Sequence, residues 1–108
     1  MLRIAGLQLD IPVRASLSER LAQASSLIEQ SLDRRVDLLV LPENWGDPAQ
    51  AKKGEALDGV LLETLAEWAA ENDLWILSGA LPLSPKALKK RSGKPVWGSV
   101  LFSNDGEI

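Results

Sequence analysis

Two apolar segments, which lack the polar alternation of a half-exposed β-strand, constrain the fold most strongly. Residues 2–11 (LRIAGLQLDI) place apolar side chains at both odd and even positions, and residues 37–41 (DLLVL) are apolar after the first aspartate. A strand that is covered on both faces has this pattern, whereas a strand with one face in water alternates. We therefore expect both segments to be strands of a sheet that is packed on each side.

Helical patterns separate these strands. Ser16 and Glu19 form a capping-box signature, which predicts a helix that carries one apolar stripe down to Leu32. A second helix is predicted from about Asp58 to Asn72. Further strands are predicted over residues 74–81, where Gly79 should allow a close backbone approach, and from residue 95 to a turn at Asn104-Asp105-Gly106. The order β-α-β-α-β-β predicts an α/β fold with parallel strands.

Length and charge exclude several classes of protein. The chain has 108 residues, which suits one small domain, and no apolar run is long enough to cross a bilayer. Gln8 and Asp10 interrupt any signal-peptide core, so we expect a cytoplasmic protein without a membrane partner. The net charge of -3 gives no general attraction to nucleic acid. The basic residues from Lys86 to Lys94 are expected to form a solvated loop, with phosphate or RNA contact as the weaker alternative.

The sequence contains no cysteine and no histidine. Disulfides, thiolate metal sites and Ser-His or Cys-His nucleophile pairs are therefore excluded within these residues. No EF-hand, zinc, dinucleotide-binding or Walker pattern is present, so neither a metal nor a cofactor is expected. Chemistry within this stretch must use carboxylates, lysines, hydroxyls or backbone groups.

The segment LVLPENW, residues 39–45, carries the best candidate for chemistry. Glu43 follows a buried strand and Pro42, at the strand end where α/β sheets bind ligands. A carboxylate beside apolar walls has a raised pKa, which suits a general base near neutral pH. The alternative is that Glu43 is a solvated glutamate at a strand end. The residues alone leave both interpretations open.

The neighbours of Glu43 also have two interpretations each. Asn44 is either an amide donor or a turn former. Trp45 either walls a substrate pocket or packs onto the core. Lys52 and Lys53 are expected to be solvated. The remaining tryptophans are predicted to be core residues, namely Trp68, Trp75 and Trp97.

The ordered segments RIAGLQLDIPV, VDLLVLPENW, LAEWAAENDLWILSGAL and VWGSVLFSNDGEI resemble the N-terminal part of a nitrilase-superfamily carbon-nitrogen hydrolase. The resemblance implies an α-β-β-α sandwich, and members commonly form dimers or larger assemblies. Family chemistry uses a cysteine nucleophile, a glutamate general base and a lysine that stabilises the tetrahedral intermediate. The glutamate matches Glu43, which becomes the predicted catalytic base, with Trp45 as a predicted substrate-binding residue.

Two of the three family groups are missing from these residues. There is no cysteine, and no lysine stands in the matching context, because the family lysine follows the hairpin at residues 104–106. The lysines that precede the hairpin do not match it; they are Lys86, Lys89, Lys90 and Lys94. Gly98 stands where the family often has asparagine.

We therefore expect residues 1–108 to be one partial domain, the N-terminal part of a carbon-nitrogen hydrolase that acts on a small amide or nitrile and is inactive as this stretch alone. The residues do not distinguish hydrolysis from acyl transfer. The alternative is a catalytically dead α/β domain that binds a protein partner or itself, because half a sandwich exposes strand edges and one sheet face. A flavodoxin-like domain for a small anionic ligand is a third alternative.

Overall fold

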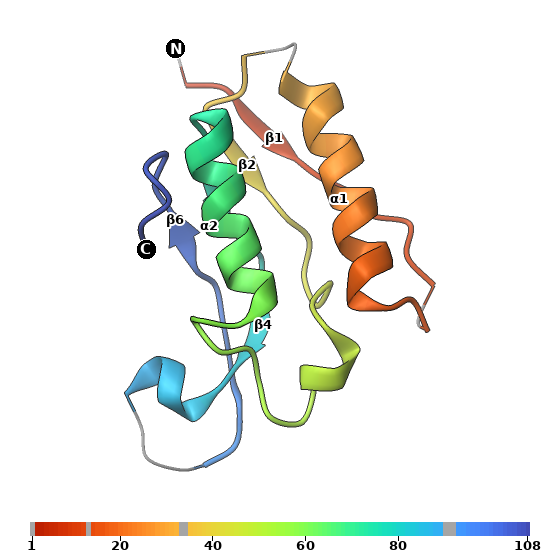
Figure 1. Cartoon of the computed structure of the whole chain (residues 1–108), viewed down its shortest axis with the longest axis vertical. Helices are drawn as coiled ribbons and strands as arrows, with labels where there is room; N and C mark the ends of the chain where they lie inside the picture. The colour runs from red at the N-terminus through yellow and green to blue at the C-terminus, as the bar shows by residue number, and fades with distance from the viewer. Residues whose placement is uncertain (1, 13, 33–34, 90–92) are drawn as a thin grey trace.

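The computed structural model describes residues 2–12, 14–32, 35–89 and 93–108. Two α-helices, α1 (Leu17–Leu32) and α2 (Val60–Asn72), lie on one face of a four-stranded sheet (Figure 1). The strands of this sheet are β1 (Ile4–Gly6), β2 (Leu38–Val40), β3 (Trp75–Leu77) and β6 (Leu101–Phe102), in the order β1-β2-β3-β6. The predicted α/β class is confirmed.

The first three strands are parallel, as predicted, whereas β6 runs antiparallel to β3. A second, two-stranded sheet pairs β4 (Leu81–Leu83) with β5 (Val96–Gly98) in antiparallel fashion. Two short 3₁₀ helices, η1 (Pro48–Gln50) and η2 (Pro85–Leu88), lie in the connections. Strand β2 therefore occupies an interior position in the larger sheet, and the candidate segment follows directly from its carboxyl end.

One row of side chains across the larger sheet forms the floor of the core. The strand register aligns Ala5, Leu39, Ile76 and Phe102, and the last three are completely or almost completely buried. The helices cover this row with the apolar stripes that the sequence predicted, which comprise Ala24, Ile28, Leu61, Leu62, Leu65 and Ala69.

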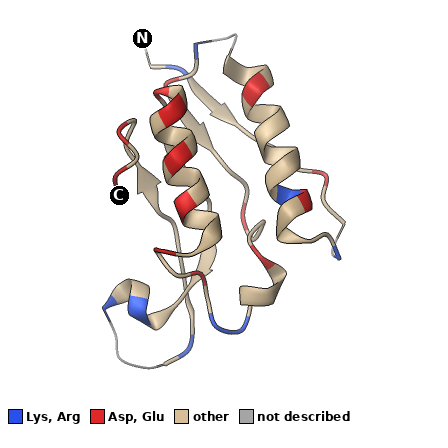
Figure 2. Ribbon diagram, in the orientation of Figure 1, with Lys and Arg blue, Asp and Glu red and all other residues tan. Residues whose placement is uncertain are grey.

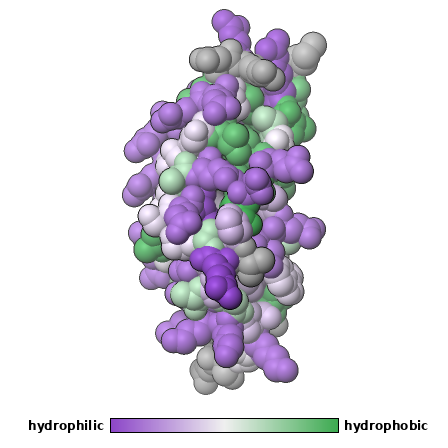
Figure 3. All heavy atoms as spheres, turned by 90° about the vertical axis from the view of Figure 1, so that its right-hand side faces the viewer, coloured by the Kyte–Doolittle hydropathy of each residue, from purple (hydrophilic) through white to green (hydrophobic). Residues whose placement is uncertain are grey.

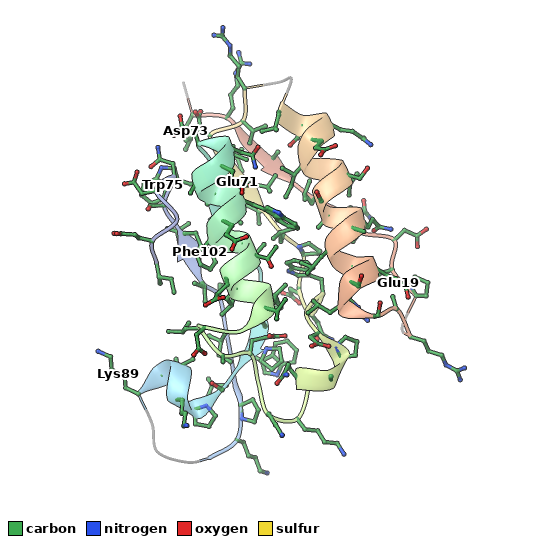
Figure 4. The ribbon with its side chains drawn as sticks, in the orientation of Figure 1. Glu19, Glu71, Asp73, Trp75, Lys89 and Phe102 are labelled. Carbon is green, nitrogen blue, oxygen red and sulfur yellow. The ribbon has the colours of Figure 1, made fainter. Side chains whose placement is uncertain are left out.

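The helix ends follow from local chemistry. The Ser16 hydroxyl accepts a hydrogen bond from the Glu19 amide at 3.2 Å, which confirms the predicted cap of α1. The N-cap of α2 is Gly59, one residue later than the predicted Asp58. Exposed glutamates, including the labelled Glu71, occupy the outer side of α2 (Figure 4). No helix in the described part of the chain is both long and apolar enough to span a membrane.

The prediction that the strands are covered on both faces is wrong for the described chain. Alternate residues of a strand point to opposite faces, so Ile4 and Trp75 point away from the helices, and they are 59% and 43% exposed. Figure 3 shows the molecule from the side of α1, where hydrophobic side chains gather toward the upper part and the right-hand edge of a largely hydrophilic surface. We call the side chains of Ile4, Leu38, Val40, Trp75, Leu77 and Leu101 the open face.

Two predicted tryptophan positions change as a result. Trp75 belongs to the open face, and Trp97 on β5 is 59% exposed, so neither is the core residue that the sequence predicted. Trp68 packs against the core, as predicted. Lys52 and Lys53 are exposed, also as predicted, whereas Lys90 lies outside the described residues.

The strand boundaries differ from the prediction because the chain changes sheet twice. The predicted strand over residues 74–81 divides into β3 and β4, and the one beginning at residue 95 divides into β5 and β6. Strand β1 covers only part of residues 2–11. The predicted turn is present, and its Gly106 amide donates to the Ser103 carbonyl at 2.8 Å.

Gly79 makes the first change of sheet possible and confirms the predicted close approach. Its φ is +76°, and a Cβ atom placed there would lie 2.2 Å from the Pro42 carbonyl oxygen and 2.5 Å from that of Leu41. Only glycine tolerates this combination of left-handed backbone and direct backbone contact. The β3–β4 connection therefore lies against the chain segment that leads from β2 to Glu43.

We predict that Gly79→Ala lowers the free energy of unfolding by at least about 2 kcal/mol, because the methyl group must displace backbone atoms. Urea denaturation followed by circular dichroism measures the change. Gly6→Ala is the matched control, because a Cβ atom at Gly6 meets nothing within 4 Å and that change should stay within about 0.5 kcal/mol. Equal stability of both variants would contradict the close approach.

Candidate functional site

The candidate site lies at the carboxyl edge of the parallel strands. The Leu41 amide donates to the Leu77 carbonyl at 3.0 Å, and the chain then leaves the sheet through Pro42 to Glu43. Glu43 is exposed and borders a cavity of about 410 Å³. The other walls come from residues 44–48, from Leu9 and Ile11 after β1, from Arg20 of α1 and from Glu55. The carboxyl edge of parallel strands is where α/β sheets hold ligands.

Asn44 shapes the backbone directly after Glu43. Its φ is +51°, in the left-handed region, where asparagine is favoured over other non-glycine residues. Its amide donates to the Ala80 carbonyl at 2.8 Å, so this turn is tied to the β3–β4 connection. The turn-forming interpretation of Asn44 is confirmed.

Trp45 anchors the loop in the core. The side chain is buried, and its indole Nε1 donates to the Ser78 carbonyl at 2.8 Å. Trp45 also lines the cavity beside Glu43. The core-packing interpretation is therefore correct, and the same residue stands where a substrate could touch it. Its substrate-binding role stays a prediction.

A carboxylate beside apolar walls, one of the two interpretations of Glu43, is found instead at a different glutamate. Glu43 is exposed because the chain returns to the core through Trp45, so the indole is buried and the carboxylate is not. Glu55 at the far end of the loop is only 3% exposed. Burial is the main cause that raises the pKa of the Glu55 carboxyl, the nearby Asp47 carboxylate raises it further, and a hydrogen bond from the Asp47 amide lowers it.

Arg20 is the second charged group that sequence reasoning missed. Its guanidinium lies inside the fold, and Nε donates to the Ala15 carbonyl at 3.1 Å. The glycine before Glu55 is a sequence signal for a close approach of the backbone. The structure shows this approach: Gly54 has a φ of +84°, and a Cβ there would lie 2.5 Å from the Leu83 carbonyl carbon. For Arg20 no sequence signal marked burial, because arginine in a helix is normally exposed.

The sequence profile of the carbon-nitrogen hydrolase family matches residues 3–108. The chain belongs to the carbon-nitrogen hydrolase family. The match includes both sheets, both helices and the whole loop from Pro42 to Glu55. It confirms the family that the ordered motifs indicated, and it agrees with the α/β architecture. A comparison with curated proteins found no match.

In this carbon-nitrogen hydrolase chain the site offers carboxylates and one guanidinium as its charged groups. Glu43, Asp47 and Glu55 border the cavity together with Arg20. Within the described residues, no three of the side chains that commonly bind metals come close enough to hold an ion. Lys52 and Lys53 carry exposed side chains on the loop between Asp47 and Glu55.

We predict that Trp45→Phe lowers the stability of this carbon-nitrogen hydrolase chain by about 2 kcal/mol or more. The change removes the indole hydrogen bond, leaves the buried Ser78 carbonyl unpaired and creates a void. Chemical denaturation measures the loss. Trp97→Phe is the matched control, because that side chain is exposed and should cost no more than about 0.5 kcal/mol. A similar loss for both variants would mean that the loop is not anchored through Trp45.

Proposed function

We propose that this chain supplies Glu43 as the general base of a carbon-nitrogen hydrolase that acts on small amides or nitriles. One observation carries the proposal: Glu43 leaves the carboxyl end of an interior parallel strand, on a loop fixed to the β3–β4 connection, and borders a cavity. The cavity volume of about 410 Å³ is in the range that suits a small molecule.

The chemistry follows from what a carboxylate can do beside a thiol. Glu43 accepts the proton of a cysteine thiol, and the resulting thiolate attacks the carbonyl carbon of an amide. The C–N bond breaks as the amine leaves with a proton, and water then cleaves the thioester to give the acid. A lysine cation stabilises the oxyanion of the tetrahedral intermediate. Cysteine is absent from these 108 residues, so the nucleophile comes from outside them.

The proposal requires a reading frame that continues beyond Ile108 into a lysine-bearing strand and then a cysteine. Sequencing the source DNA past this codon tests that requirement directly. A stop codon at this point would remove the enzymatic proposal and leave Glu43 as a loop residue without chemistry.

Glu43→Gln should lower kcat on a small amide by at least about 100-fold in the protein made from its full coding sequence. The loss arises because the amide side chain cannot accept the thiol proton. Steady-state release of ammonia or amine measures the rate. Glu67→Gln, an exposed position on α2, serves as the matched control and should keep the original rate. Unchanged turnover by Glu43→Gln would exclude the assigned role.

The open face favours a second candidate function, association with another protein surface. All side chains of the open face are apolar, and those of Ile4, Trp75 and Leu101 are substantially exposed. Monomeric soluble proteins rarely leave a contiguous apolar surface in water. We propose that the 108-residue chain self-associates through this face when no other layer covers it.

Light scattering coupled to size-exclusion chromatography, over a wide range of protein concentration, tests the association. The wild-type chain should form dimers or larger species, and Leu101→Lys should shift it toward the monomer because a buried lysine is costly. Val60→Lys is the matched control, since Val60 is an exposed apolar residue on α2 away from the open face. A wild-type monomer at every concentration would exclude self-association.

A further inference from the structure

Arg20 and Glu55 are the two charged side chains that are buried among the described residues. Arg20 is 8% exposed, and Glu55 is 3% exposed. They come from separate elements: Arg20 is the only basic residue of α1, and Glu55 ends the loop that begins after β2. Figure 2 shows that acidic residues occur on both helices and along this loop. Burial of a charge is costly unless hydrogen bonds compensate for it. The partners of these two groups therefore indicate what they do.

Both side chains bind the same peptide group. Arg20 Nη1 donates to the Gly46 carbonyl oxygen at 3.2 Å, and the Asp47 amide donates to Glu55 Oε1 at 3.0 Å. The Gly46 carbonyl and the Asp47 amide belong to one planar unit and point to opposite sides of it. A guanidinium on one side and a carboxyl on the other therefore fix both the position and the rotation of this peptide plane.

Each of the two side chains is itself held by the fold. The Arg20 guanidinium also donates to the Ala15 carbonyl, which precedes the cap of α1. The Glu55 backbone pairs with β4, where its amide donates to the Pro82 carbonyl at 2.6 Å and its carbonyl accepts from the Ser84 amide at 2.9 Å. The peptide between Gly46 and Asp47 is thus attached to the first helix and to the second sheet at the same time.

Little space is left around the Cα atom of Gly46, between the Glu55 carboxyl and the core. A Cβ atom at Gly46 would lie 3.1 Å from Glu55 Oε1 and 3.1 Å from a Leu81 methyl carbon. A side chain there would press on the carboxyl that receives the Asp47 amide. The absence of a side chain at Gly46 therefore lets the carboxyl of Glu55 approach without displacement.

We propose that Arg20 and Glu55 are positioning residues for Glu43, and that they act by fixing the Gly46–Asp47 peptide. The segment between Glu43 and this peptide is short and already held, because the Asn44 amide binds Ala80 and the Trp45 indole binds Ser78. Fixing the Gly46–Asp47 peptide therefore holds this segment at both ends. This inference rests on the proposed role of Glu43 as general base.

Ionisation of Glu55 should be measurable at the Asp47 amide that donates to it. Arg20 of α1 and Glu43 and Asp47 of the loop border the same cavity as Glu55. Burial raises the pKa of Glu55 above its ordinary value of 4.5. The Asp47 amide donates to this carboxyl, so its proton resonance should move downfield as Glu55 loses its proton. The midpoint of that movement should lie above pH 4.5.

A pH titration of the ¹⁵N-labelled full chain by NMR tests the contact. The Asp47 amide should show a step with a midpoint above 4.5 in the wild type. Glu55→Gln should abolish this step, because its side chain carries no proton that ionises in this range. A step of the same size and midpoint in Glu55→Gln would overturn the inference.

Hydrogen exchange tests the positioning role. Glu55→Ala should speed exchange of the Asp47 and Asn44 amides by about tenfold, because the Asp47 amide loses the carboxyl oxygen that accepts its hydrogen bond. Glu55→Gln should restore most of the protection, since its side-chain oxygen can still accept the Asp47 amide. Glu67→Ala is the matched control. The Ser78 amide, bound to the Val100 carbonyl at 2.9 Å, reports whether the whole fold has loosened.

Kinetics of the protein made from its full coding sequence separate this inference from the proposed function. Glu55→Ala should lower kcat by about tenfold with little change in KM, and Glu55→Gln should recover most of the rate. If Glu43→Gln keeps the wild-type kcat, the proposed function is wrong, but the contact between Glu55 and the Asp47 amide can still be observed by NMR. If Glu43→Gln abolishes activity while Glu55→Ala has no effect on kcat, the positioning role is wrong.

Discussion

The structure depends on one buried row of side chains across the four-stranded sheet. Leu39, Ile76 and Phe102 come from three neighbouring strands and form the surface on which both helices pack. Burial of apolar area is the main favourable term in folding, so this row fixes β2 inside the sheet and both helices on one face of it. The candidate loop can project in a defined direction because the strand that precedes it is held in this way.

The loop itself is held mostly through its backbone and through one indole. Gly79 lets the β3–β4 connection touch the Leu41–Pro42 segment, Asn44 takes a left-handed conformation, and Trp45 returns to the core. Glu43 is exposed, as is Asn44, although the backbone on both sides is anchored. This division suits a general base, because the carboxylate must reach a substrate while its backbone stays fixed.

Local patterns made much of the fold and part of the site predictable from the sequence. Ser16, the helix stripes and Gly79 obey rules that involve a few neighbouring residues or a single glycine conformation, and LVLPENW located the loop. The positions of Trp75, Trp97 and the strand breaks were predicted wrongly, because they depend on which face of a sheet is covered and on where the chain changes sheet. The burial of Arg20 and Glu55 was not predicted, since it arises from contacts between segments far apart in the sequence.

The two changes of sheet lie side by side and are hydrogen-bonded to each other. The Ser78 amide donates to the Val100 carbonyl at 2.9 Å, and the Ser78 hydroxyl accepts from the Val100 amide at 2.9 Å. The smaller sheet, with only β4 and β5, is too small to be stable alone. Its formation is therefore coupled to that of the larger sheet at this crossing, and the two sheets constitute one cooperative folding unit.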